Sequence, residues 1–193
     1  MKYNPYLDMD GCLSDYRGHF TDLFGVTPQE YRKTNSYEDS LNLVESAGTD
    51  FWASMKWMPD GQEWWKYISG KGVPLKIISW PIDRDSCIPG KLEWVINNLG
   101  LKEEDCIFTQ QKHEYCSGWN DLLIDDTCSN LISWREAGGM AIHHANTEST
   151  IQIIEALNAA ADKPSEVSEL EELSSQADLS GAEEQENKNR TLN

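Results

Sequence analysis

The sequence predicts an α/β fold in which helices cover both faces of a central parallel sheet. Short apolar segments alternate with helical segments from residue 74 onward. This alternation is typical of strand–helix–strand units, whose parallel strands are buried on both faces. Several of the apolar segments end in acidic or hydroxyl side chains, as strands beside a ligand site do. With 193 residues, the chain is long enough to bury one core and to carry a small insert.

The first predicted strand, Tyr3–Leu7, ends in a short acidic motif. Asp8 and Asp10 follow it two residues apart, so an extended chain directs both carboxylates to one side. Gly11 then allows a sharp turn. Two carboxylates this close repel each other unless a cation or a proton lies between them. The motif therefore predicts a metal site or a protonated acid, and an ordinary Asp-rich turn is the alternative.

The stretch from Leu13 to Gly72 carries several helix signals. Leu13–Phe24 places aromatic residues on one helical face. Thr27–Glu30 combines an N-cap threonine, a proline and a glutamate in the order typical of a helix start. Residues 35–50 are polar and are expected to be irregular, whereas Glu63–Ile68 is expected to be helical. The stretch also holds the aromatic residues Phe51, Trp52 and Trp57.

The rest of the chain predicts four more strands and three more helices. The predicted strands are Pro74–Ser79, Cys106–Thr109, Leu122–Asp126 and Met140–His143. The predicted helices are Gly90–Leu99, Asn130–Ala137 and Glu148–Ala161. In a parallel sheet all strand carboxyl ends share one edge, so the polar residues that follow three of the strands should converge. These residues are Asp8, Asp10, Ser79, Asp125 and Asp126. Their convergence favours a phosphate or metal site over an isolated turn.

The chain is strongly acidic. Its formal net charge of −17 argues against binding polymeric nucleic acid, which needs a basic surface for the phosphates. Residues 162–193 contain nine acidic and three basic residues and no aromatic residue. We therefore expect residues 162–193 to form an acidic, disordered tail.

Neither a membrane nor a secretory location is expected. The N-terminus lacks a basic and then apolar targeting segment, and no apolar stretch approaches the roughly 20 residues of a membrane helix. Five cysteines without a CxxC pair predict free thiols in a reducing cytoplasm, which would be a host cytoplasm if the chain is viral. The sequence indicates no oligomeric state.

The polar motifs resemble, in order, those of the haloacid-dehalogenase-like (HAD-like) phosphohydrolases. Asp8–Leu13 is similar to the first motif, DxDGxL, and Leu123–Asp126 to the fourth. Ser79 is similar to the hydroxyl residue of the second motif. Lys112 is similar to the lysine of the third motif, and Lys91 is the alternative.

This resemblance spans residues 3–155 and implies a domain organisation. A Rossmann-like three-layer sandwich would be built from residues 1–13 and 73–161. A small helical cap would be inserted after the first strand, over residues 14–72. The cap would act as a lid above the edge at which the strands end.

Within this superfamily, the chain more closely resembles the 5′(3′)-deoxyribonucleotidases and their phage and bacterial relatives. The residues that carry this resemblance are the YLDMDG opening, Phe51-Trp52, the helix Gly90–Val95, the LLIDD strand and Ala137–Ile142. Two residues depart from the pattern. Trp80 stands where a small polar residue commonly follows the second motif, and Cys12 replaces a more usual valine or threonine. The resemblance implies hydrolysis of nucleoside monophosphates.

The resemblance also implies a role for each motif residue. Asp8 would attack phosphorus and form an aspartyl-phosphate. Asp10 would act first as general acid and then as general base. Ser79 and Lys112 would bind phosphoryl oxygens. The cofactor would be Mg²⁺. Its ligands would be Asp8, the main-chain carbonyl of Asp10, and Asp125 or Asp126, which the sequence does not rank.

Aromatic residues of the cap would bind the substrate. Tyr16, Phe51, Trp52 and Trp57 would form a slot in which a nucleobase stacks, and Trp80 would narrow the phosphate pocket. A small helical lid also needs a core, so the alternative is that these aromatic residues pack on one another. The competing functions are a phosphatase for another small phosphoester, such as a sugar phosphate, and a catalytically idle domain that binds partners.

Overall fold

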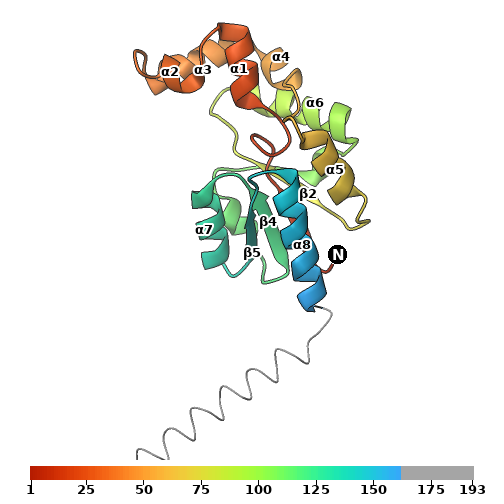
Figure 1. Cartoon of the computed structure of the whole chain (residues 1–193). Coiled ribbons are helices and arrows are strands. Elements are labelled where there is room, and N and C mark those ends of the chain that lie inside the picture. The colour runs from red at the N-terminus through yellow and green to blue at the C-terminus, as the bar shows by residue number, and fades with distance from the viewer. Residues whose placement is uncertain (162–193) are drawn as a thin grey trace, which may run out of the picture. The chain divides into compact units, whose positions relative to one another are not determined.

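The structure is a computed structural model that describes residues 1–161, and its centre is a five-stranded sheet (Figure 1). The strands are β1 (Asn4–Leu7), β2 (Lys76–Ser79), β3 (Cys106–Phe108), β4 (Asp121–Asp125) and β5 (Met140–His143). Their order across the sheet is β3-β2-β1-β4-β5, and every neighbouring pair is parallel. The predicted Rossmann-like α/β fold, a central parallel sheet with flanking helices, is confirmed.

Strand β1 lies in the middle of the sheet, and its position determines where the site forms. Leu7 pairs with Ile77 of β2 and with Ile124 of β4. The residues that follow these three positions therefore meet at one edge of the sheet. All three side chains are fully buried, as expected for parallel strands covered on both faces.

Five helices lie between β1 and β2 in the sequence. They are α1 (Tyr16–Phe24), α2 (Pro28–Tyr31), α3 (Tyr37–Ser46), α4 (Thr49–Ala53) and α5 (Gly61–Ser69). Figure 1 shows α1 to α4 grouped together, and ring contacts join them: Phe20 packs on Tyr31, and Tyr16 packs on Phe51. The assignment of residues 14–72 to a separate cap stays a prediction.

The remaining helices follow the later strands. They are α6 (Cys87–Leu99), α7 (Cys128–Glu136) and α8 (Thr147–Ala161), with the 3₁₀ turns η1 (Glu103–Asp105) and η2 (Lys112–Tyr115). Helix α7 lies beside β4 and β5 (Figure 1). Its residues Leu131 and Trp134 pack with Ile78 and Leu123 of the sheet in one buried cluster.

Residues Met1–Ile153 form one compact unit, which contains all the described strands. A second unit begins at Ile154, and its described part is the end of α8, residues 154–161. The predicted acidic tail, residues 162–193, lies outside the described residues. Within residues 1–161, every helix is too short or too polar to span a bilayer.

Helix α3 shows that the prediction of an irregular segment over residues 35–50 was wrong. The Ser36 hydroxyl accepts the amide of Asp39, and the Asp39 carboxylate accepts the amide of Ser36. This capping box stabilises the helix start by about 1 kcal/mol. Leu41 and Val44 then give the helix a small buried face.

Helix α1 begins at Tyr16 rather than at the predicted Leu13. Leu13 belongs to the turn that closes the acidic motif, and its amide donates to the carbonyl of Met9. Asp15 caps the helix, because its carboxylate accepts the amide of Gly18. The turn thus delays the helix by satisfying the backbone locally.

Helix α6 begins at Cys87, ahead of the predicted start at Gly90. Pro89 falls in its first turn, where the missing N–H costs no helical hydrogen bond. Gly90 lies against α4: a Cβ atom there would be 2.5 Å from the Thr49 carbonyl oxygen and 2.6 Å from Cβ of Trp52. The absence of a side chain at Gly90 therefore allows α4 and α6 to pack in direct contact.

Candidate active site

Asp8 lies directly after the central strand β1 and is almost fully buried, with 6 % of its surface exposed. Its amide donates to the carbonyl of Ile124 on β4, at 2.9 Å. The chain then turns sharply at Gly11, where φ is +88°. A Cβ atom at Gly11 would lie 2.3 Å from Oδ2 of Asp126, so a side chain there would displace the Asp126 carboxylate and strain the turn.

Lys112 joins Asp8 to the end of β4. Its buried ammonium donates to Oδ1 of Asp8 at 2.5 Å and to Oδ2 of Asp125 at 2.7 Å. Asp125 also accepts the amide of Thr127 at 2.8 Å and the side-chain amide of Asn130 at 3.0 Å. Asp125 is therefore held in place by three donors.

Lys91 contacts Asp10, the second carboxylate of the acidic motif. Its ammonium, from α6, donates to Oδ2 of Asp10 at 2.5 Å, to the Ser79 hydroxyl at 2.9 Å and to the Trp80 carbonyl at 2.9 Å. The Ser14 hydroxyl donates to the second oxygen of Asp10 at 2.9 Å. The two lysines that the sequence offered as alternatives therefore both reach the site, each beside a different aspartate.

The site holds more negative charge than its lysines balance. Burial, together with the charges of Asp125 and Asp10, raises the pKa of Asp8 to about 7, although Lys112 opposes this shift. Burial and the charge of Asp125 also raise the pKa of Asp126. Burial disfavours the charged form of Lys112, but the carboxylates of Asp8 and Asp125 raise its pKa overall. A bound cation would relieve the repulsion among these carboxylates.

The donor set fits a divalent cation. Asp8, Asp126 and Cys12 each offer one atom, and the three atoms lie within 4.8 Å of one another. Carboxylate oxygens are the ligands that Mg²⁺ prefers. Of the two acids that the sequence could not rank, Asp126 lies in this group and Asp125 is held by Lys112.

An aromatic cavity of about 190 Å³ opens beside Asp10. Its lining residues are Asp10, Tyr16, Arg32, Tyr37, Leu41, Trp52, Trp80, Ile82 and Lys91. The rings of Tyr16 and Trp52 stack with their centroids 5.8 Å apart and an interplanar angle of 23°. Three of the predicted substrate-binding residues, Tyr16, Trp52 and Trp80, therefore line one cavity.

The two other aromatic residues predicted to bind substrate lie outside this lining. Phe51 is 1 % exposed and packs on Tyr16, His19 and Phe24. Trp57 packs on Trp94, and its indole N–H donates to Oδ1 of Asn98 at 3.2 Å. Both contribute to packing among the helices, which was the alternative interpretation of this aromatic run.

Arg32 and Tyr37 also line the cavity, although no sequence motif points to either residue. The guanidinium of Arg32 lies 5.0 Å from the ring centroid of Tyr37, at a cation–π distance. Tyr37 is the first residue of α3, a segment expected to be irregular. Without that helix, the sequence pattern offers no basis for directing either side chain towards Asp10.

A second cavity is also lined by Asp10. It has a volume of about 370 Å³, and Gly11, Tyr16, Met58 and Asp126 are among its lining residues. The candidate cation ligand Asp126 therefore borders a cavity that a small molecule can enter.

The loop after β2 joins the site to helix α3. Arg84 forms an ion pair with Glu38 and donates to Oδ1 of Asn42 at 3.0 Å. The Ser86 hydroxyl donates to Glu45 at 2.5 Å and accepts the indole N–H of Trp52 at 3.2 Å. These four hydrogen-bonded contacts connect the inserted helices to the loop that carries Trp80.

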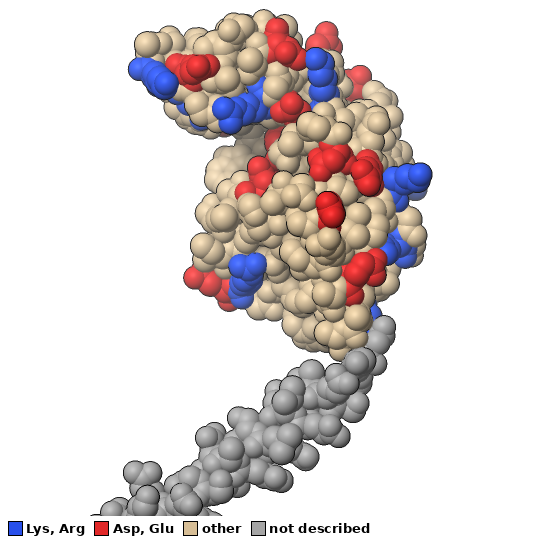
Figure 2. Space-filling view, viewed as in Figure 1, with Lys and Arg blue, Asp and Glu red and all other residues tan. Residues whose placement is uncertain are grey.

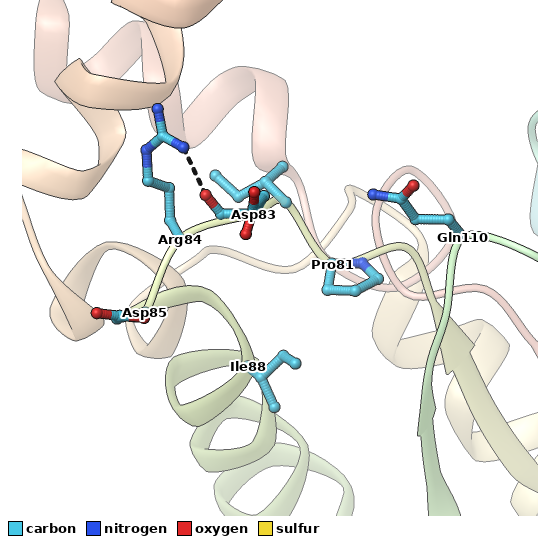
Figure 3. Close-up of a pocket in the computed structure, with 7 residues that line it drawn as sticks. Pro81, Asp83, Arg84, Asp85, Ile88 and Gln110 are labelled. Carbon is cyan, nitrogen blue, oxygen red and sulfur yellow. Dashed lines mark hydrogen bonds between the residues drawn. The ribbon is translucent and has the colours of Figure 1, made fainter.

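The same loop borders a further cavity of about 460 Å³ (Figure 3). Figure 3 shows Pro81, Asp83, Arg84 and Asp85 along the loop, with Ile88 on α6. None of the predicted motif residues lines this cavity.

A scan against protein-family models finds no match for the sequence, and a search of curated proteins finds none either. Among solved structures, the chain is similar to a hydrolase from Streptococcus pneumoniae TIGR4. The TM-score is 0.54 at 16 % sequence identity, over 80 % of this chain and 100 % of that chain.

Two further similar structures carry the superfamily name. A HAD-superfamily hydrolase from Ehrlichia chaffeensis gives a TM-score of 0.47 at 13 % identity, over 81 % of this chain and 98 % of that chain. A HAD hydrolase from Entamoeba histolytica HM-1:IMSS gives 0.45 at 13 % identity, over 78 % and 88 %. At such identities the similarity concerns the fold alone, and it rests on the pneumococcal structure, whose TM-score is 0.54.

Proposed function

We propose that this protein is a HAD-type, Mg²⁺-dependent phosphomonoester hydrolase that dephosphorylates nucleoside monophosphates through an aspartyl-phosphate on Asp8. The observation that carries the proposal is the arrangement at the end of β1. Two lysines, a serine and two further aspartates from separate segments surround Asp8 and Asp10. Burying so many ionisable groups costs free energy, so packing alone does not account for them.

Asp8 is the proposed nucleophile. One of its carboxylate oxygens forms a bond to phosphorus while the bond from phosphorus to the leaving alcohol oxygen breaks. The hydrogen bond from Lys112 to Oδ1 orients the carboxylate for this attack. A bound Mg²⁺ would reduce the repulsion between the carboxylate and the anionic phosphate.

Asp10 is the proposed proton shuttle. It gives a proton to the departing alcohol oxygen and later takes one from the water that hydrolyses the intermediate. Lys91 and Ser14 hold its two oxygens. The Ser79 hydroxyl lies beside the Lys91 ammonium, so both can donate to the phosphoryl oxygens.

Asp8 and Asp126 are the proposed side-chain ligands of Mg²⁺, with the main-chain carbonyl of Asp10 as a third ligand. Asp125 has a different role in this proposal. It is held by Lys112, Thr127 and Asn130 and keeps Lys112 directed at Asp8. Residues of this kind orient the ligands of a metal site.

The aromatic cavity is the proposed site of the nucleobase. Its lining includes Tyr16, Trp52 and Trp80, and stacking of a base on an aromatic face contributes about 1–3 kcal/mol. Arg32 adds hydrogen-bond donors at the rim for polar atoms of the base. Trp80 is 46 % exposed, so its ring is open to stacking by a base. A sugar phosphate would not use this ring, so the aromatic lining favours a nucleotide.

A small molecule is the proposed partner, not polymeric nucleic acid. On the face of residues 1–161 that Figure 2 shows, lysine and arginine side chains are scattered among acidic ones and form no continuous basic surface. Binding to nucleic acid phosphates requires such a surface. The five cysteines are free, which fits a reducing compartment, and we expect the cytoplasm.

The test is phosphate release from a panel of nucleoside monophosphates and sugar phosphates, with Mg²⁺ or with EDTA. We expect turnover of a nucleoside monophosphate with Mg²⁺ only, none by Asp8→Asn, and full turnover by Glu63→Gln, an exposed acid on α5. Preference for a sugar phosphate would contradict the nucleotidase proposal. Failure to hydrolyse any member of the panel would contradict an enzymatic function.

Substitutions of Asp8 and Asp10 should have different effects on Mg²⁺ binding. Asp10→Asn should lose turnover and still bind Mg²⁺, because the proposed ligand is its main-chain carbonyl. Asp8→Asn should weaken Mg²⁺ binding by more than about tenfold, because it removes a carboxylate ligand. Titration calorimetry measures both affinities, and an equal loss in the two variants would refute this division of roles.

A further inference from the structure

Cys12 is a buried thiol that the proposed chemistry does not use. It lies in the turn after β1, and none of its surface is exposed. Its sulfur lies within 4.8 Å of carboxylate oxygens of both Asp8 and Asp126. Among residues 1–161, this thiol forms no hydrogen bond, whereas those of Cys106 and Cys116 are directed at main-chain carbonyls. The Cys12 thiol therefore faces the two carboxylates without a hydrogen-bonding partner.

One sulfur and two carboxylate oxygens form a mixed donor set. Magnesium is a hard ion that takes oxygen ligands, whereas thiolate sulfur selects softer ions such as Zn²⁺. In protein sites zinc lies about 2.3 Å from sulfur and about 2.1 Å from carboxylate oxygen. In a trigonal or tetrahedral site such bonds hold sulfur and oxygen about 3.6–3.8 Å apart, so donor atoms within 4.8 Å of one another need to approach by up to about 1 Å.

We propose that Cys12 gives this site a second metal specificity. Mg²⁺ binds through Asp8 and Asp126, and a thiophilic divalent cation such as Zn²⁺ or Cd²⁺ binds at the same place with the Cys12 sulfur as a third ligand. The inference rests on the proposed function in one respect, because the same two carboxylates are assigned to Mg²⁺.

The thiophilic ion excludes Mg²⁺ from the two carboxylates that both cations share, Asp8 and Asp126. When the metal–sulfur bond forms, the S–H bond breaks and the proton leaves to solvent, so binding releases one proton from Cys12. Asp8 ligates either cation through one carboxylate oxygen, so the inhibition comes from the loss of Mg²⁺ and not from the loss of the nucleophile. The thiophilic cation therefore inhibits the Mg²⁺-dependent reaction. It binds tightly because the Cys12 sulfur is a third ligand.

The test is a Cd²⁺ titration of the full chain without substrate, in a thiol-free reductant, following the ultraviolet absorption of cadmium–thiolate charge transfer. We expect one Cd²⁺ to bind with this absorption band, and Mg²⁺ to lower the apparent affinity for Cd²⁺ by competition. Cys12→Ser should lose the band and weaken Cd²⁺ binding by at least about tenfold. Asp126→Asn should keep the band and also bind Cd²⁺ more weakly. Cys128→Ser, which alters an exposed thiol, should retain the band and the wild-type affinity.

A band that survives Cys12→Ser, or an apparent Cd²⁺ affinity that does not fall as Mg²⁺ is raised, would overturn the inference. The Mg²⁺ competition uses the wild-type chain, so it remains decisive even if Cys12→Ser does not fold. The two proposals also fail separately. Mg²⁺-dependent phosphate release without a cadmium–thiolate band would refute the role of Cys12 and leave the proposed function intact. A cadmium–thiolate band without hydrolysis of any panel member would refute the proposed function and leave the role of Cys12 intact.

Discussion

At the scale of a single residue, Asp8 combines burial with proximity to two other acids. Its pKa of about 7 in the folded chain lies well above the value of about 3.9 for an unfolded aspartate. Between these two pH values the folded state holds a proton that the unfolded state has lost. Stability therefore falls as pH rises from about 4 to 7, and the penalty persists at higher pH.

Asp8→Asn should for this reason stabilise the metal-free protein. The variant removes the buried charge, so its free energy of unfolding should exceed that of wild type by about 2–4 kcal/mol at neutral pH and by little near pH 4. Thermal or urea unfolding in EDTA between pH 4 and 8 measures the difference. The exposed Glu63→Gln should show no such growth with pH. A constant difference across this range would contradict the assigned shift.

The motif residues could be predicted to converge, but which side chain contacts which could not. They are Asp8, Asp10, Ser79, Lys112, Asp125 and Asp126. Strand ends converge in any parallel sheet, so the meeting of Asp8, Ser79 and Asp125 needed only the alternating pattern. Lys91 was harder, because the direction of a helical side chain depends on how the helix is rotated. The sequence named it only as the alternative to Lys112. Lys91 falls on the buried stripe of α6, at helical spacing from Cys87 and Trp94, which is the signal that could have assigned it to the site beside Lys112.

At the scale of the secondary-structure element, the positions at which helices begin and end depend on contacts that the local sequence pattern does not reveal. The helix α3 was missed because its buried apolar face is only two residues wide, Leu41 and Val44. The capping box of Ser36 and Asp39 is visible in the sequence, but the polar composition of the segment favours an irregular chain. A sequence rule that gives caps more weight would have recovered this helix.

Gly90 gives a prediction at the same scale. A Cβ atom at this position would lie 2.5 Å from the Thr49 carbonyl oxygen, and backbone atoms of a packed helix cannot yield as a flexible side chain does. Gly90→Ala should therefore destabilise the chain by about 1–3 kcal/mol through overpacking, although alanine favours a helix. It should also move Trp52 away from the aromatic cavity.

Urea unfolding of Gly90→Ala measures this cost. Gly118→Ala is the matched control, because a Cβ there meets no atom within 4 Å and the variant should unfold close to wild type. If Gly90→Ala were as stable as wild type, α4 and α6 would not be in the close contact described.

At the scale of the whole molecule, the parallel α/β class followed from the sequence, whereas the strand order required the structure. Alternation of strands and helices indicates parallel pairing but does not say which strand lies in the centre. The contact of the inserted helices with the loop after β2 could also not be predicted from the sequence, because it depends on pairs of residues far apart in the chain. Arg84 with Glu38, and Ser86 with Glu45, are such pairs.

These pairs attach one face of α3 to the loop after β2. Glu38, Asn42 and Glu45 follow one another at helical spacing, so all three can point to the same side. Their partners Arg84 and Ser86 follow Trp80, which lines the aromatic cavity. The attachment therefore positions Trp80 and Trp52 relative to each other, without touching Asp8 or its lysine.

Arg84→Met should loosen this attachment and weaken substrate binding more than catalysis. The change keeps an unbranched side chain and removes the bonds to Glu38 and Asn42. With the substrate that the panel identifies, we expect KM to rise by about 3- to 30-fold and kcat to stay within about twofold, as when binding shared by ground and transition states is lost. The Arg84 side chain is 16 % exposed and Glu38 is 64 % exposed. The methionine keeps most of the buried side-chain packing, so stability should change by no more than about 1 kcal/mol.

Two further variants test whether the effect of Arg84→Met on KM comes from the lost contact with α3 or from the lost positive charge. Lys102→Met, which removes the exposed pair with Glu104, should leave KM unchanged. Glu38→Gln combined with Arg84→Met should add little to either single change, because both variants break the same contact. A fall in kcat equal to the rise in KM would instead mean that Arg84 acts on the chemical step. An unchanged KM in Arg84→Met would mean that α3 does not position the cavity.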